Sequence, residues 1–281
     1  MLLEIHYTGI NMEYLARESA PFSSEFWAQI DDAAIGTLKK FLIGRRFLNL
    51  FGPLGAGVST VFVDGVEKAE TLEDGIGRIS GRRQVELPLF YENFTLNWRD
   101  IEEAQKNGYP IDLTVVKEAA KKAAKREDQM ILFGNKVLNT QGLMNADGAF
   151  HVKKSDWKKG ENAFTDVAQG ISHLFSADCR GRKALIVSPD LYLDLQRLQQ
   201  SAGILESERI EKLIGGHIYV FGDFGTNQAV LVCAEPEYMD LAVGADYSVG
   251  YLELKDFNHS FRMMETAALR IKNADAIVVF E

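Results

Sequence analysis

Cysteine is scarce in this chain. Among 281 residues only Cys179 and Cys233 are cysteines, and they lie far apart in the sequence. Neither belongs to a CxxC pair or has a histidine at ligand spacing, which argues against a thiolate metal site or a catalytic disulfide. We therefore expect two reduced, partly buried thiols, as in a cytoplasmic protein.

Long apolar runs and clustered positive charge are also missing. No stretch approaches the roughly 18 apolar residues of a membrane span, and the first lysine or arginine is Arg17, so the charged leader of a signal peptide is not seen. The formal net charge is −9, whereas phosphate binding needs grouped positive side chains. These features predict a cytoplasmic protein that binds neither membrane nor nucleic acid.

Motifs that carry chemistry are absent too. The glycine-rich stretch FGPLGAG (51–57) is not followed by Gly-Lys-Ser/Thr, and the glycines between 75 and 81 do not have dinucleotide-binding spacing. The histidines have no second ligand at the spacing of a helical metal site; they are His6, His151, His173, His217 and His259. The sequence predicts no catalytic residue and no metal site.

The strongest pattern present is an alanine-rich helix. Apolar residues form 46% and charged residues 25% of the chain, as in a soluble globular protein of one large domain or two smaller ones. Residues 111–134, IDLTVVKEAAKKAAKREDQMILFG, have one apolar face, a cap at Asp112 and a stop at Gly134. They predict a helix about 30 Å long with an exposed lysine face. We expect Glu127 and Asp128 on different faces, in salt bridges with Arg126 or Lys125.

The remaining segments predict a mixed α and β protein. We expect a helix at 24–42, two strands within 57–90 joined by a long polar tip at 67–83, a strand at 94–98, and an alternating α/β unit at 142–236. The chain then returns to strands at 239–243, 249–252, 261–271 and 276–280. The two-stranded arm would be marginal alone, so another subunit is its natural support.

Trp98 allows two interpretations. It is either a strand tryptophan buried against the long helix, or an exposed indole that stacks beside Arg99 on a planar ring such as a flavin.

Six stretches occur in an order typical of one protein family. They are MEYLARESAPFSSEFWAQID (12–31), IGRRFLNLFGPLG (43–55), PLFYENFTLNWRDIEEA (88–104), REDQMILFG (126–134), GLMN (142–145) and METAALRIKNADAIVVF (264–280). Together they resemble encapsulins, the shell proteins of bacterial and archaeal nanocompartments. The resemblance covers nearly the whole chain from Met12, and residues 1–11 form an extension relative to it.

This resemblance implies an α+β fold, that of tailed-phage major capsid proteins of the phage Hong Kong 97 type. The implied parts are an N-terminal arm (1–23), an N-terminal helix with the entry to the peripheral domain (24–56), and an extended loop (57–90). A peripheral domain (91–141 and 237–281) with a spine helix (112–134) and an axial domain (142–236) complete the chain.

The resemblance also implies a function. Encapsulins self-assemble into closed icosahedral shells in the cytoplasm and enclose cargo enzymes, such as ferritin-like iron-storage proteins or peroxidases, through a short C-terminal cargo peptide. The peptide-docking surface would include Trp27, Ile30, Ala34, Leu38, Arg45 and Asn49, and the pore loop would include Gln199, Gln200, Ser201 and Glu206. Some members hold a flavin against a tryptophan, but Trp98 is displaced by one residue, so no cofactor is predicted.

Two alternatives remain open. A phage or prophage major capsid protein that packages DNA would share the fold, but the acidic chain would repel a genome and no long scaffolding segment precedes Met12. A soluble α/β enzyme or flavin-binding protein lacks support from a catalytic motif.

Overall fold

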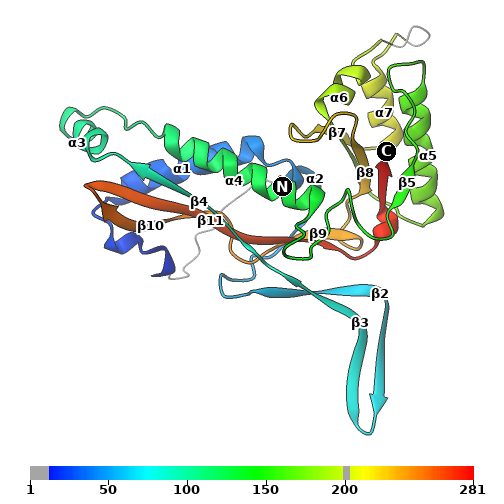
Figure 1. The fold of residues 1–281 in the computed structure, drawn as a ribbon, viewed down its shortest axis with the longest axis horizontal. Coiled ribbons are helices and arrows are strands. Elements are labelled where there is room, and N and C mark those ends of the chain that lie inside the picture. The colour runs from blue at the N-terminus through cyan, green and yellow to red at the C-terminus, as the bar shows by residue number, and fades with distance from the viewer. Residues whose placement is uncertain (1–12, 199–202) are drawn as a thin grey trace.

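The computed structural model describes residues 13–198 and 203–281. It shows an elongated body, a second lobe at one end and a hairpin that projects from the body (Figure 1). The first lobe is a five-stranded sheet in which β1, β9, β11 and β10 follow one another and β4 also pairs with β11. Its strands are β1 (Leu50–Phe51), β4 (Leu89–Leu96), β9 (Met239–Val243), β10 (Ser248–Lys255) and β11 (Asn258–Ile271).

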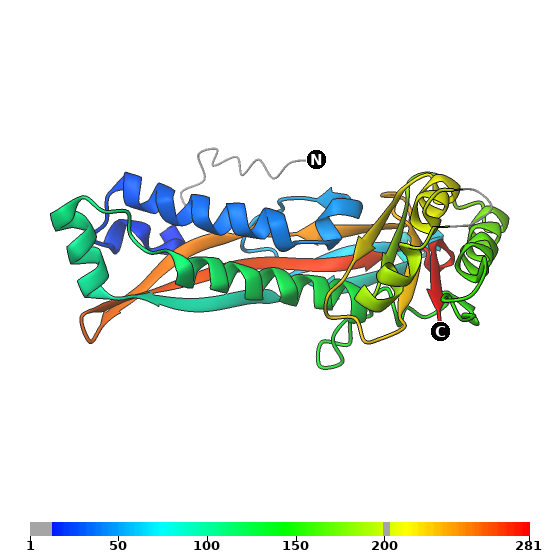
Figure 2. The ribbon, with the colours of Figure 1, turned by 90° about the horizontal axis from the view of Figure 1, so that it is seen from above.

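Helices pack against this sheet. Figure 2 shows α1 and α4 running alongside the long strands of the first lobe. Their buried side chains form one cluster with those of β4, β10 and β11. The helical elements are η1 (Glu13–Leu15), η2 (Arg17–Ser19), α1 (Ser24–Phe41), α2 (Gly44–Phe47), α3 (Trp98–Asn107) and α4 (Thr114–Phe133).

Helix α4 confirms the helix predicted from the alanine-rich segment. The carboxylate of Asp112 accepts a hydrogen bond from the backbone N–H of Thr114 at 2.8 Å, and the helix ends at Gly134. Gly134 has φ +64°, and a Cβ there would lie 2.2 Å from the carbonyl oxygen of Thr140, so only glycine fits. The alanines are buried and the lysine face is exposed, as predicted.

Two predictions about segments that precede α4 were wrong. The polar stretch 67–83 is not a long tip, because β2 (Thr60–Glu73) and β3 (Ile76–Glu86) pair almost to their ends. Asp74 and Gly75, with φ 50° and 80°, form the two-residue turn that suits the twist of a hairpin. Trp98 does not extend a strand either: Asn97 accepts from the N–H of Arg99 at 2.9 Å and begins α3.

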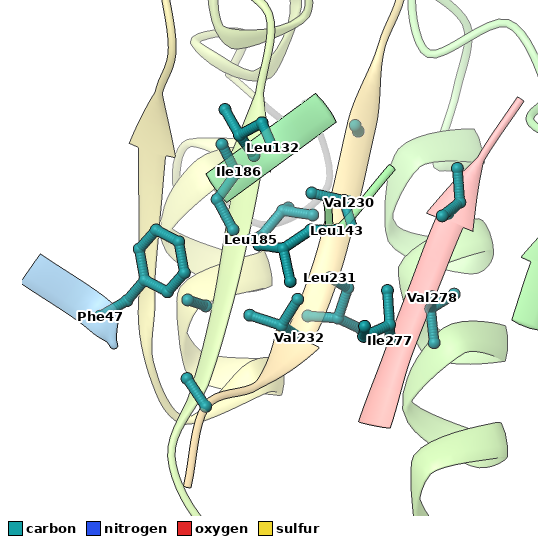
Figure 3. Close-up of a cluster of buried hydrophobic side chains, with 14 of the residues drawn as sticks. Phe47, Leu132, Leu143, Leu185, Ile186, Val230, Leu231, Val232, Ile277 and Val278 are labelled. Carbon is teal, nitrogen blue, oxygen red and sulfur yellow. The ribbon is translucent and has the colours of Figure 1, made fainter. Parts of the chain in front are cut away.

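The second lobe is a five-stranded sheet flanked by helices. Its strand order is β5, β12, β8, β6, β7, and the apolar core fills the space around β6, β8 and β12 (Figure 3). The elements are β5 (Phe150–Val152), α5 (Asn162–Ser176), β6 (Lys183–Val187), α6 (Pro189–Leu195), α7 (Glu206–Ile214), β7 (His217–Val220), β8 (Ala229–Cys233), η3 (Ala274–Ala276) and β12 (Ile277–Phe280).

The last strand, β12, departs from the predicted domain assignment of residues 237–281. Strand β12 pairs with β8 and β5 in the sheet of the second lobe, although 237–281 was assigned to the peripheral domain. The sequence of a fully buried strand does not indicate which sheet the strand joins, because the residues on both of its faces are apolar. The chain thus crosses from the first lobe to the second after β11.

Candidate functional site

The arm formed by β2 and β3 is the feature least supported by its own chain. Its base is anchored where Arg270 donates a hydrogen bond to the carbonyl of Phe62 at 3.0 Å, and where Val61 and Leu87 join a small buried cluster. Beyond the base the hairpin extends away from both lobes (Figure 1).

Apolar side chains are exposed near the tip of this arm. Leu72 is 75% exposed and Ile76 is 74% exposed, on either side of the turn. In the hairpin register Leu72 lies opposite Gly77, and Ile76 lies opposite Glu73, so the two side chains point to opposite faces. A two-stranded ribbon cannot bury either residue by itself, so both faces of the tip are suited to contact with another chain.

The predicted cargo-docking stripe on α1 does not form a surface. Trp27, Ile30, Ala34 and Leu38 are only 7%, 0%, 3% and 2% exposed, because they pack against α4, β10 and β11. The cavity beside Ala34 and Leu38 has a volume of about 10 Å³, which is room for one water molecule and not for a side chain. In the single subunit this stripe is therefore the packing face of the helix and offers no open groove.

Arg45 and Asn49 are also turned inward. The Arg45 side chain is 4% exposed and donates to Glu127 at 2.9 Å, to Asp246 at 2.8 Å and to Glu265. Asn49 donates to the carbonyl oxygen of Ala234 at 3.1 Å and so joins the first lobe to the end of β8. Arg45 is therefore committed to a buried ionic cluster, whereas Asn49 is half-buried and its contact with a peptide stays a prediction.

Glu127 and Asp128 differ from their prediction as well. Both are buried, and Glu127 pairs with Arg45 and not with a neighbour on the helix surface. The carboxylate of Asp128 accepts from the backbone N–H groups of Ile43 and Gly44, at 3.0 and 2.8 Å. The sequence contained a signal, since the two acids follow the buried Ala123 and Ala124 by four residues and hence share their faces.

Burial and neighbouring charge perturb this cluster strongly. Burial raises the pKa of Asp128 to about 7, with a further contribution from Glu127. Burial, followed by repulsion from Glu127, raises the pKa of Glu265 well above its usual range. Burial opposes the positive charge of Arg45, but attraction to Glu127, Glu265 and Asp246 outweighs it and raises the pKa. The cluster holds structure together and has no opening for a substrate.

Of the predicted pore loop, Gln199, Gln200 and Ser201 lie outside the described residues. Glu206, at the start of α7, is fully buried and does not line an opening. Its carboxylate lies 3.0 Å from the guanidinium of Arg197, and its backbone N–H donates to the carbonyl of the same residue at 3.0 Å. Glu206 therefore links the start of α7 to Arg197. Its assignment to the pore loop is corrected, because its side chain is buried.

Trp98 lies on the surface at the start of α3 and is 41% exposed, so the interpretation as a buried strand tryptophan was wrong. The guanidinium carbon of Arg99 lies 5.5 Å from its ring centre, and the ring of Phe257 is 6.5 Å away. That no flavin binds here stays a prediction. Within residues 13–198 and 203–281, no cluster of three histidine, cysteine or acidic side chains is suited to a metal ion.

The helices in the described part of the chain are all too short or too polar to cross a bilayer. Residues 179 and 233 are buried free cysteines, as predicted for these two thiols.

Solved structures with the same fold are shells and capsids. A virus-like particle from Pyrococcus furiosus superposes with a TM-score of 0.73 at 22% identity, over 92% of this chain and all of that chain. The capsid of the Myoviridae phage XM1 superposes with a TM-score of 0.64 at 12% identity, over 85% of this chain and 91% of that chain. The fold is thus that of tailed-phage capsid proteins, as predicted.

Sequence comparison gives the family. The family model described as an encapsulating protein for peroxidase matches residues 12–268. The type 1 encapsulin shell protein EncA of Myxococcus xanthus is 34% identical over 96% of both chains. A diheme-cytochrome-encapsulin shell fusion protein of Kuenenia stuttgartiensis is 35% identical over 92% of this chain and 73% of its own length. With a matching family model, a one-third identical relative and a capsid fold, this chain belongs to the encapsulin family of shell proteins.

Proposed function

We propose that this chain closes an icosahedral shell through its β2–β3 arm and that the shell encloses a cargo enzyme. The observation that carries the proposal is the arm itself, which projects from the body with Leu72 and Ile76 exposed on opposite faces. Contact with a neighbouring subunit would remove both side chains from water, a favourable change of about 25 cal/mol per Å² of apolar surface. The main partners of the chain are therefore other copies of itself.

The shell would be a structural container without catalysis of its own, in the cytoplasm. The predicted cargo is a ferritin-like or peroxidase-type enzyme captured by a short C-terminal peptide. Two facts support a redox cargo. The description of the family model names a peroxidase as what is encapsulated, and the Kuenenia relative is a fusion with a diheme cytochrome. The peptide would have to dock outside the α1 stripe, since Trp27, Ile30, Ala34 and Leu38 are occupied by core packing.

Expression of the chain alone tests assembly. We expect electron microscopy to show uniform hollow particles without nucleic-acid absorbance. The double variant Leu72→Ser and Ile76→Ser should yield small oligomers, because the tip loses its apolar contacts. The matched control is Glu73→Gln, an exposed polar position between them. Shells of normal size from the double variant would show that the tip is not an assembly contact, and particles filled with nucleic acid would favour the phage capsid alternative.

Purified shells also test the prediction that no cofactor is needed. We expect no flavin absorbance and normal assembly. A flavin spectrum that is lost in Trp98→Ala, with the shell intact, would instead assign the exposed indole as its binding site.

A further inference from the structure

A buried ionic cluster joins three parts of the first lobe. Arg45 comes from α2, Glu127 from α4 and Glu265 from β11. The Nε of Arg45 donates to Glu127 Oε1 at 3.0 Å, its Nη2 donates to Glu127 Oε2 at 2.9 Å, and Nη2 also donates to Glu265 Oε2. Its Nη1 donates to Asp246 Oδ1 at 2.8 Å. We call these four residues the α2 cluster.

The charges of the α2 cluster do not balance. One guanidinium faces three carboxyl groups, and the side chains of Glu127 and Glu265 are 1% and 0% exposed. Glu127 Oε2 and Glu265 Oε2 both accept from the same Nη2 of Arg45, so two buried carboxyl groups lie close together, and a proton on one of them removes their mutual repulsion. The Oε1 atom of Glu265 has no hydrogen-bond partner within the described chain, as suits a neutral acid better than a charged one.

The groups that surround this pair make a second negative charge more costly. Asp128 on α4 lies beside Glu127 and accepts from the first N–H groups of α2. Tyr247 packs its ring 5.3 Å from the Arg45 guanidinium and donates its hydroxyl to the carbonyl of Ala123. Among the described residues the cation that contacts the Glu127 and Glu265 pair is Arg45. Removal of the shared proton would therefore leave a buried charge without compensation.

We propose that the α2 cluster is a proton-dependent lock that holds α2 against α4 and β11. While Glu127 and Glu265 share one proton, the lock is closed. At alkaline pH hydroxide removes the proton to form water, the carboxyl group becomes a second buried carboxylate, and α2 separates from the body. Because α2 follows directly on α1, this loosens the subunit and opens the shell.

The direction of the pH effect follows from linkage. The folded chain keeps the proton to a higher pH than the unfolded chain, so the folded state is favoured most at low pH and loses stability as pH rises above the ordinary carboxyl range. Titration of other groups could also open the shell at acid pH, but that transition would be separate from the alkaline one. The lock acts within each subunit, and so does not depend on the arm as the assembly contact.

The test compares assembled shells of the wild-type chain, Glu265→Gln and Glu127→Gln between about pH 6 and about pH 10. Light scattering follows the shell, and circular dichroism with heating follows the subunit. Each variant replaces the protonated pair by one amide and one acid. We expect its opening midpoint to move up by at least about one pH unit relative to the wild-type chain. The matched control is Glu92→Gln, which removes an acid from a partly exposed ion pair with Arg126 and should leave the midpoint unchanged.

Two results would overturn the lock. One is an alkaline midpoint that is the same in the wild-type chain and in both variants. The other is an infrared spectrum of wild-type shells at about pH 8 without a protonated-carboxyl band, a measurement that needs no variant to fold. The lock can also be tested apart from assembly. If the arm variants do not assemble, but their subunits still show the shifted midpoint, the result supports the lock independently of the arm.

Discussion

At the scale of single residues, the buried acids of α4 decide how the N-terminal helices are held. The carboxylate of Asp128 accepts from two backbone N–H groups at the start of α2. We expect Asp128→Ala to lower the free energy of unfolding by about 2–4 kcal/mol, because two buried donors lose their partner. Chemical denaturation of the subunit measures this. Asp223→Ala, which removes an exposed ion pair with Lys125, is the control and should cost less than about 1 kcal/mol.

The same residue predicts a pH dependence. Burial raises the pKa of Asp128 from 3.8 to about 7, so the folded chain binds this proton more tightly than the unfolded chain. Its contribution therefore favours the folded state at acid pH and is lost as the pH rises from about 4 to about 7. In Asp128→Asn the melting temperature should depend less on pH between about 4 and about 7, because the group that titrates has been removed. A slope unchanged across that range would show that Asp128 does not titrate there.

At the scale of an element, the end of α4 depends on one glycine. Ala at position 134 would bring a Cβ within 2.2 Å of the Thr140 carbonyl in a left-handed conformation, so Gly134→Ala should destabilise the subunit by at least about 2 kcal/mol. The control is the same substitution at Gly36 in α1, where a Cβ meets nothing within 4 Å. Gly36→Ala should stabilise by about 0.5–1 kcal/mol. Thermal unfolding that ranks the two variants in the opposite order would contradict this assignment.

At the scale of the whole molecule, one apolar cluster continues from the first lobe into the second, and a few polar contacts add to it at the junction. Asn49 donates to Ala234, Arg182 donates to the carbonyl of Phe47 at 2.9 Å, and the hydroxyl of Tyr219 reaches the carbonyl of Arg46. The angle between the lobes enters the curvature of any assembly built from them, because a closed shell repeats one interface geometry.

We therefore expect Asn49→Ala to broaden the distribution of shell diameters in electron micrographs, with a loss of subunit stability of only about 1 kcal/mol. Gln29→Ala, on the exposed side of α1, is the matched control and should give uniform shells. A uniform population of normal diameter from Asn49→Ala would show that the other contacts alone set the angle.

Much of this fold could be predicted from local chemistry. The alanine period of 111–134, its acid before the first turn and Gly134 after the last are sufficient to define α4, because capping and helical spacing act between residues close in sequence. Ser188 and Pro189 likewise mark the start of α6. The order of the six family stretches is sufficient to indicate the encapsulin family, because together they extend along nearly the whole chain.

Tertiary structure decided what local patterns leave open. The apolar stripe of α1 could have been a groove or a packing face, and only α4, β10 and β11 lying across it made Trp27 and Leu38 part of the core. Arg45 could not be matched to Glu127 and Glu265 from sequence, since its partners lie 82 and 220 residues away. The sequence by itself determined the long helices and most strands, although it missed the start of α3 at Trp98 and the length of the β2–β3 pairing. Burial and charge pairing were settled by contacts between distant segments. The reason is that spacing rules reach only a few residues, while desolvation depends on everything packed around a group.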